Sequence, residues 1–164
     1  MPSKFLYSFG CITLSLQWIA LTLMVVIGYL VAPVLFHYLP EKTAGEIAGR
    51  LFDISSYVYL MVFSCVLALM KFQKQVGFVI WSSLINLVVI LLIVFVLAPW
   101  MDEIKSLYPQ GGLKASQDWT LFASLHGIYQ LAYLLIILLL AIGIIQQFRW
   151  MRNTFSTEVL NKNI

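Results

Sequence analysis

Four long apolar runs constrain this chain more than any other feature of its sequence. They contain no Asp, Glu, Lys or Arg, and they cover approximately residues 14–36, 54–70, 76–98 and 121–145. A helix needs about 20 apolar residues to cross a hydrocarbon core of about 30 Å. We therefore predict an all-α membrane protein whose four transmembrane helices form two antiparallel hairpins in a lipid bilayer.

The composition excludes a soluble domain. Hydrophobic residues make up 62% of the chain and charged residues only 10%, so a soluble fold of this length would leave much apolar surface in water. The net charge of +3 is spread over the loops and tails, and we expect no binding to nucleic acid. We predict one four-span domain, residues 1–146, followed by a short cytoplasmic tail, residues 147–164, of which we expect the last dozen residues to be mobile.

The basic residues predict the orientation in the membrane. In a four-span chain the N-terminal tail, the second loop and the C-terminal tail share one side. That side carries Lys4, Lys71, Lys74, Arg149, Arg152 and Lys162, whereas the other carries Lys42, Arg50, Lys105 and Lys114. Because short cytoplasmic segments carry the excess of Lys and Arg, we expect both termini in the cytoplasm and the protein in the cell inner membrane.

The polar segments predict how the spans are connected. We expect the first span to end near Pro33 and the third near Pro99. Residues 37–53 have apolar positions at helical spacing, which predicts an amphipathic helix that runs on into the second span. The second loop is so short that spans two and three must form a hairpin. Residues 101–120 form the longest loop, with an irregular turn at Pro109, Gly111 and Gly112.

A short sequence pattern that occurs twice in the chain is open to two interpretations. Span one closes with LVAPVLF and span three with VLAPW, and a Leu-Phe pair opens each following span. This pattern is compatible with a parallel repeat about an axis normal to the membrane. Chance recurrence of such pairs in apolar sequence explains it equally well.

The polar residues of the spans are the candidates for function, since such groups are costly in hydrocarbon. His126 is followed by Gln130 and Tyr133 at i+4 and i+7, which places the three on one helical face. We expect Asn86 of span three at the same depth as Gln130, with both amides facing the bundle interior. The stripe then either holds the bundle together by hydrogen bonds or lines a small polar cavity with His126 as ligand or proton carrier.

The opposite side from the termini also carries residues that are able to bind a metal. His37, Asp53, Asp118 and His126 offer mixed nitrogen and oxygen ligands, but no pair has the local spacing of a metal motif. Bis-histidine haem ligation requires two histidines at membrane depth, and His126 is alone there. We therefore expect no cofactor, with haem or a divalent metal as the alternative.

Two stretches resemble a known family. GYLVAPVLFHYLPEKTAGEIAGRLF contains Ala-Pro-x-Leu-Phe and Ala-Gly-x-x-x-Gly-x-Leu-Phe, and WTLFASLHGIYQLAYLL opens span four. Together they resemble the domain of unknown function 4149 family, which is similar to transmembrane-protein-205-like proteins. The resemblance implies a four-span domain without an established activity, and broader similarity to copper-resistance and haem-pathway membrane proteins. It implies importance for Ala32, Pro33, Phe36, Gly45, Gly49, Phe52, His126 and Gly127.

No phosphate-binding loop, nucleophile elbow or metalloprotease motif is present in the sequence. The favoured hypothesis is therefore a non-enzymatic multi-pass membrane protein with a structural, transport or partner-subunit role. The alternative is a metal- or haem-linked redox or transport factor that uses His126. The sequence leaves open the ligand, the pathway and whether the chain forms a homo-oligomer or binds another membrane protein.

Overall fold

The computed structural model describes residues 2–72 and 77–162, and all regular structure in these residues is helical. In chain order the segments are α1 (Pro2–Val25), the π-helical η1 (Val26–Val31), α2 (Ala32–Tyr38), α3 (Glu41–Phe72), α4 (Phe78–Leu92), the π-helical η2 (Ile93–Leu97), α5 (Ala98–Ser106), the 3₁₀ turn η3 (Leu113–Ala115) and α6 (Trp119–Lys162). Four continuous stretches are long and apolar enough to span a membrane: Phe5–Tyr38, Glu41–Lys71, Val79–Ser106 and Trp119–Thr154. The predicted class is confirmed.

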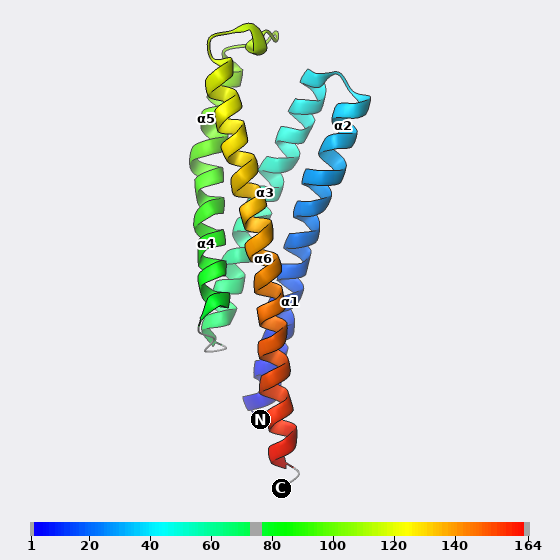
Figure 1. The fold of residues 1–164 in the computed structure, drawn as a ribbon, viewed down its shortest axis with the longest axis vertical. Coiled ribbons are helices and arrows are strands. Elements are labelled where there is room, and N and C mark those ends of the chain that lie inside the picture. Colours follow the sequence, from blue (N-terminus) through cyan, green and yellow to red (C-terminus); the bar gives the residue numbers. More distant parts are fainter. Residues whose placement is uncertain (1, 73–76, 163–164) are drawn as a thin grey trace.

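The four spans form a bundle in which packed neighbours are antiparallel (Figure 1). The chain rises through α1 and α2, descends through α3, rises through α4 and α5, and descends through α6. Both α1 and α4 pack against α3 and α6, so the helices alternate in direction around the bundle. We call the end that carries both termini the near side and the opposite end the far side.

The helices do not end at their proline residues, contrary to prediction. In both rising spans a π-helical segment precedes an Ala-Pro pair, and the helix then continues, to Tyr38 after Pro33 and to Ser106 after Pro99. Proline removes one N–H and crowds the carbonyl one turn earlier, and a local π adjustment can accommodate both effects within a membrane helix. The two halves share this local geometry, as a parallel repeat requires, while the repeat itself stays a prediction.

Three further expectations can be compared with the structure. The amphipathic segment does begin the helix that continues into the second span, because α3 is unbroken from Glu41 to Phe72. An irregular turn is confirmed at Gly111 and Gly112, whose φ angles of 93° and 94° favour glycine. The tail is helical up to Lys162, because α6 continues through it, while its mobility stays a prediction.

The far-side loop between α5 and α6 is attached to the turn between α2 and α3. The Lys42 ammonium donates to the carbonyl oxygen of Pro109 at 2.6 Å, and Lys114 pairs with Glu41 at 2.6 Å. These contacts connect the two hairpins across the far side. We call this segment, residues 107–118, the far-side strap.

Candidate functional site

The predicted stripe on α6 exists, but most of it lies outside the packed core. His126 and Gln130 are both exposed, and the Nε2 atoms of their side chains are 3.0 Å apart. The His126 ring stacks on Phe122 at a centroid distance of 6.1 Å. Tyr133, on the same helical face one turn further, is only 5% exposed. The stripe therefore passes from the protein interior to an accessible surface within two turns.

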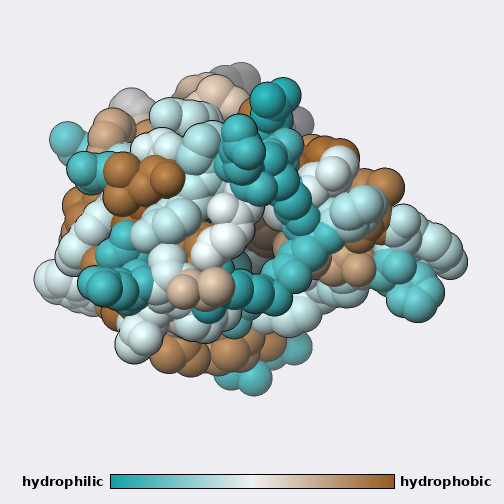
Figure 2. All heavy atoms as spheres, turned by 90° about the horizontal axis from the view of Figure 1, so that it is seen from above, coloured by the Kyte–Doolittle hydropathy of each residue, from teal (hydrophilic) through white to brown (hydrophobic). Residues whose placement is uncertain are grey.

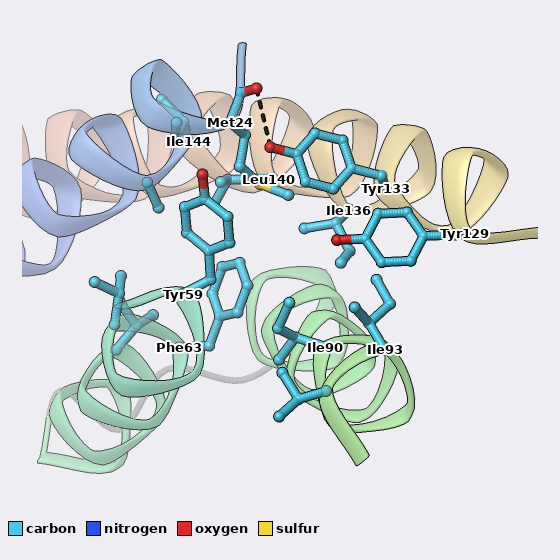
Figure 3. Packing of buried hydrophobic residues seen from close by; sticks show 14 of the residues in the cluster. Met24, Tyr59, Phe63, Ile90, Ile93, Tyr129, Tyr133, Ile136, Leu140 and Ile144 are labelled. Atoms are coloured by element: carbon cyan, nitrogen blue, oxygen red, sulfur yellow. Dashed lines mark hydrogen bonds between the residues drawn. The ribbon is translucent and has the colours of Figure 1, made fainter. Parts of the chain in front are cut away.

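Tyr133 is the point at which this face of α6 joins the core (Figure 3). Its hydroxyl donates to the carbonyl oxygen of Met24 at 3.0 Å, at the junction of α1 and η1. A Cβ built on Gly28 would lie 3.0 Å from the Tyr133 ring, so glycine is what permits this approach. Phe52 of α3 packs edge-on against the same ring at 5.4 Å. Three spans thus converge on one tyrosine.

Beyond Tyr133 the two helices separate, and this separation leaves His126 and Gln130 uncovered. Towards the far side, α2 leans away from α6 and packs against α3 (Figure 1). Seen from the far side, the molecular surface is hollowed near its centre, and hydrophilic side chains form much of the rim (Figure 2). We call the exposed surface of His126 and Gln130, on the far side of the Tyr133–Gly28 contact, the far-side opening.

Charged side chains lie beside this opening. The Lys105 ammonium is 3.1 Å from the Asp102 carboxylate, 5.9 Å from the centroid of the Phe122 ring and 3.9 Å from a Cβ built on Gly49. Lys105 of α5 therefore reaches both α3 and α6. The Asp53 carboxyl group, next to Phe52 on α3, belongs to an exposed residue. A ligand at the opening would therefore meet both a positively charged donor and negatively charged acceptors.

The prediction that Gln130 faces the bundle interior is wrong, because its side chain is exposed. The prediction of a common depth with Asn86 is also wrong. Ser82 faces Gly143, and Lys105 lies over Phe122, so in this antiparallel register Asn86 is opposite Leu140. Gln130 precedes Leu140 by ten residues on α6, so it lies roughly 15 Å nearer the far side. The predicted depths were counted from the predicted ends of the spans. The observed spans cover 28 and 36 residues and extend beyond the apolar runs 76–98 and 121–145, so those counts were wrong.

The residues proposed for a metal site are not brought together. His37 is exposed on the last turn of α2 and packs edge-on against Tyr38 at 4.7 Å, while Asp118 accepts a hydrogen bond from Tyr108 at 2.8 Å. Across residues 2–72 and 77–162 no three His, Cys, Asp or Glu side chains are grouped to hold a metal ion. The His126 Nε2 atom is 3.0 Å from the Gln130 Nε2 atom, and the expectation of no cofactor stays a prediction.

The sequence analysis missed a second group of polar side chains inside the near-side half. Thr13, Gln17, Ser82, Ser83 and Gln147 are buried there, as is the predicted Asn86. The Gln17 Oε1 and Asn86 Oδ1 atoms make no hydrogen bond in the described part of the chain. A buried acceptor without a partner costs about 1–3 kcal/mol. An isolated amide in an apolar run was the available signal at Gln17, as it was at Asn86 and Gln130.

The sequence of residues 18–109, more than half of the chain, matches the family described as domain of unknown function, DUF4149. The chain belongs to this family. The match includes the Ala-Pro pair at Pro33 and the motif glycines of this DUF4149 protein, whereas His126 and Gly127 lie beyond it. No curated protein matches the chain, and no solved structure matches it.

The motif glycines of the DUF4149 region have structural roles in this protein. A Cβ on Gly45 would be 4.0 Å from the Phe36 ring, and a Cβ on Gly49 would be 3.9 Å from Lys105. Gly45 thus lies where α2 packs against α3. Gly49 lies where the Lys105 side chain approaches α3. Phe52, also in the motif, supports Tyr133 and Tyr129 at 5.4 and 6.0 Å. The matched region therefore builds the α3 side of the far-side opening.

Proposed function

We propose that this DUF4149 protein is a non-enzymatic transport protein that binds an amphipathic, lipid-like molecule at the far-side opening. The observation that carries the proposal is the exposure of His126 and Gln130 on a helical face that is buried one turn further at Tyr133. Lipid tails form no hydrogen bonds, so polar groups at such a position favour a ligand with a polar head.

The level of the opening suits a molecule that lies across the membrane boundary. With Lys105 over Phe122, His126 is about level with Trp100, whose ring is 46% exposed. Tryptophan is enriched at the interface between hydrocarbon and water. Leu134, one turn below Gln130 on α6, and Leu30 of η1 are exposed apolar side chains. A head group would therefore meet polar groups while its tail remained in hydrocarbon.

The charges near the opening favour a polar or zwitterionic head group. The Lys105 ammonium and the Gln130 amide are donors, and the carboxylates of Asp53 and Asp102 are acceptors. Charge-assisted hydrogen bonds to such groups are stronger than neutral ones. Phosphate and amine groups on one molecule would both find complementary partners here.

The hydrogen bonds also favour binding over catalysis. His126 pairs with Gln130, and the neighbouring Ser124 donates to the carbonyl oxygen of Thr120 at 2.8 Å. Ser55 likewise donates to the carbonyl oxygen of Phe52 at 3.0 Å. Nucleophilic catalysis requires a hydroxyl held by a general base, and these hydroxyls are directed to their own helices.

The test is lipid movement in vesicles of phosphatidylethanolamine and phosphatidylglycerol that contain a trace of fluorescent phosphatidylethanolamine. The wild-type protein is expected to accelerate movement of the probe between leaflets, and the double variant His126→Leu/Gln130→Leu is expected to lose this acceleration. Ser124→Ala, another change on the exposed surface of α6, should retain it. Wild-type vesicles that match protein-free vesicles, or a double variant as active as Ser124→Ala, would contradict the proposal.

The same purified samples distinguish the competing functions. A haem absorbance band or a stoichiometric metal that disappears in His126→Ala would replace the proposal by the metal- or haem-linked alternative. A stable dimer that cross-links through cysteine at Gly127, in a variant with Cys11 and Cys65 replaced by serine, would assign the exposed face to a second copy of the chain.

A further inference from the structure

The near-side half of the bundle encloses polar side chains that the far-side opening does not use. Gln17 of α1 and Asn86 of α4 are each 1% exposed, and Ser82 and Ser83 are 2% and 4% exposed. An apolar layer that includes Met24 and Ile90 lies towards the far-side tyrosines (Figure 3), and these two residues are seven and four positions along their helices from Gln17 and Asn86. The near-side group is therefore a separate site.

The helix register places these side chains at one level. Gly10 faces Met151 and Gly28 faces Tyr133, so Gln17 is opposite Ile144 of α6. Ser82 is 3.4 Å from a Cβ built on Gly143, the residue next to Ile144. Asn86 lies one helical turn from Ser82, about 6 Å further into the membrane. Two spans, α1 and α4, thus direct buried polar groups to the same layer of the interior.

The buried atoms of this layer that lack a hydrogen-bond partner in the part of the chain that the structure describes are two amide oxygens. Gln17 Oε1 and Asn86 Oδ1 have no hydrogen-bond partner in the described residues. The Ser82 and Ser83 hydroxyls both donate to the carbonyl oxygen of Val79, at 3.0 and 2.9 Å, which leaves their lone pairs to the interior. Buried polar groups are nearly always satisfied by protein or by ordered water. The complementary ligand is a hydrogen-bond donor.

Electrostatics decide between a cation and a neutral donor. The sequence has no Asp or Glu from Thr13 to Gln17, from Ser82 to Asn86 or from Gly143 to Gln147, so no carboxylate would balance a cation. Lys71, Arg149 and Arg152 instead make the adjoining end of the bundle positive. A buried, unpaired charge is far more costly than a buried neutral group that is hydrogen-bonded.

We propose that this layer is an internal hydration site in which ordered water donates hydrogen bonds to Gln17 and Asn86. Small residues line this layer: Ala20 is fully buried one turn from Gln17, and Gly143 faces Ser82. A buried water requires polar partners and room for one molecule, and it usually makes about three hydrogen bonds. The site is independent of the proposed lipid binding, because it lies in the opposite half of the bundle.

Two methionines provide an internal comparison for the test. Met70 Sδ is 3.6 Å from Ser83 Oγ, whereas Met24 lies in the apolar layer, and both side chains are 0% exposed. X-ray radiolysis converts bound water into hydroxyl radicals, which oxidise nearby methionine to the sulfoxide. In the intact protein in nanodiscs, we expect mass spectrometry to find Met70 oxidised several-fold faster than Met24.

Two substitutions connect this difference to the proposed site. Asn86→Leu and Gln17→Met each remove one acceptor, and the oxidation rate of Met70 is expected to fall towards that of Met24 in either variant. Two variants are used so that one can serve if the other fails to fold, as judged by size-exclusion chromatography. Equal oxidation of Met70 and Met24 in the wild type, or oxidation of Met70 that both folded variants leave unchanged, would overturn the proposal.

Discussion

Two glycines in the spans have opposite surroundings. Gly28 lies against the Tyr133 ring, which is held by its hydrogen bond to Met24 and by packing against Phe52. A Cβ on Gly127 would meet nothing within 4 Å. Glycine is therefore required at the first position for close approach, whereas at the second it only lowers helix propensity.

This contrast makes Gly28→Ala and Gly127→Ala a matched pair. We expect Gly28→Ala to lower the free energy of unfolding by about 1–3 kcal/mol, since the constrained ring leaves little room for another methyl group. Gly127→Ala should leave it unchanged or raise it by up to about 1 kcal/mol. Denaturant unfolding in detergent micelles measures both. Similar values for the two variants would show that Tyr133 moves freely.

The Tyr133 hydroxyl can be tested without altering the ring. Tyr133→Phe leaves the Met24 carbonyl without this donor, and we expect the free energy of unfolding to fall by about 1–3 kcal/mol. Tyr57→Phe is the control, because Tyr57 is 60% exposed. The same micellar unfolding measurement applies. Equal destabilisation in the two variants would mean that the bond at 3.0 Å contributes nothing specific.

At the scale of the element, sequence reasoning identified the spans and misplaced several of their ends. The Ala-Pro pairs predict span ends because proline is tolerated close to the ends of membrane helices. The π-helical segments before them shift the hydrogen-bond register, and α2 and α5 continue instead. Whether a helix stops or adjusts depends on the neighbouring spans that stabilise it, which sequence spacing does not reveal.

The ion pair that attaches the far-side strap to α3 can be tested by exchanging the charges of its two residues. Glu41→Lys should break the ion pair with Lys114, and the double variant Glu41→Lys/Lys114→Glu should restore it. Both side chains are exposed, so we expect a small change in stability, below about 1 kcal/mol. Limited proteolysis is more sensitive: cleavage within residues 107–118 should accelerate in the single variant and recover in the double variant. Equal cleavage in all three proteins would show that the ion pair does not restrain the strap.

At the scale of the whole molecule, the near side carries both termini, and its orientation in the membrane is a prediction. The excess of Lys and Arg on this side predicts that it faces the cytoplasm. A reporter enzyme that works only in the cytoplasm should be active when it is fused after residue 164. A reporter that works only outside the cytoplasm should be active when it is inserted in the far-side strap. Reversed activities would invert the orientation.

Sequence and structure contributed differently to the site. The i+4 and i+7 spacing correctly placed Gln130 and Tyr133 on the face of His126, because helical periodicity is a local property. Burial along that face was not predictable. It changes from exposed to buried within two turns because α2 leans away from α6, and that depends on the packing of α2 against α3.

By itself the sequence determined the four spans, their alternating direction, the hairpin of spans two and three and the amphipathic start of α3, since hydrophobic runs and short loops act over neighbouring residues. Only the tertiary structure decided which polar groups are uncovered and which are sealed inside. Gln130 is exposed and Gln17 is buried, although each is an amide in an apolar run. The difference is physical: burial depends on which other helix occupies the space beside a residue, and contacts between spans determine that.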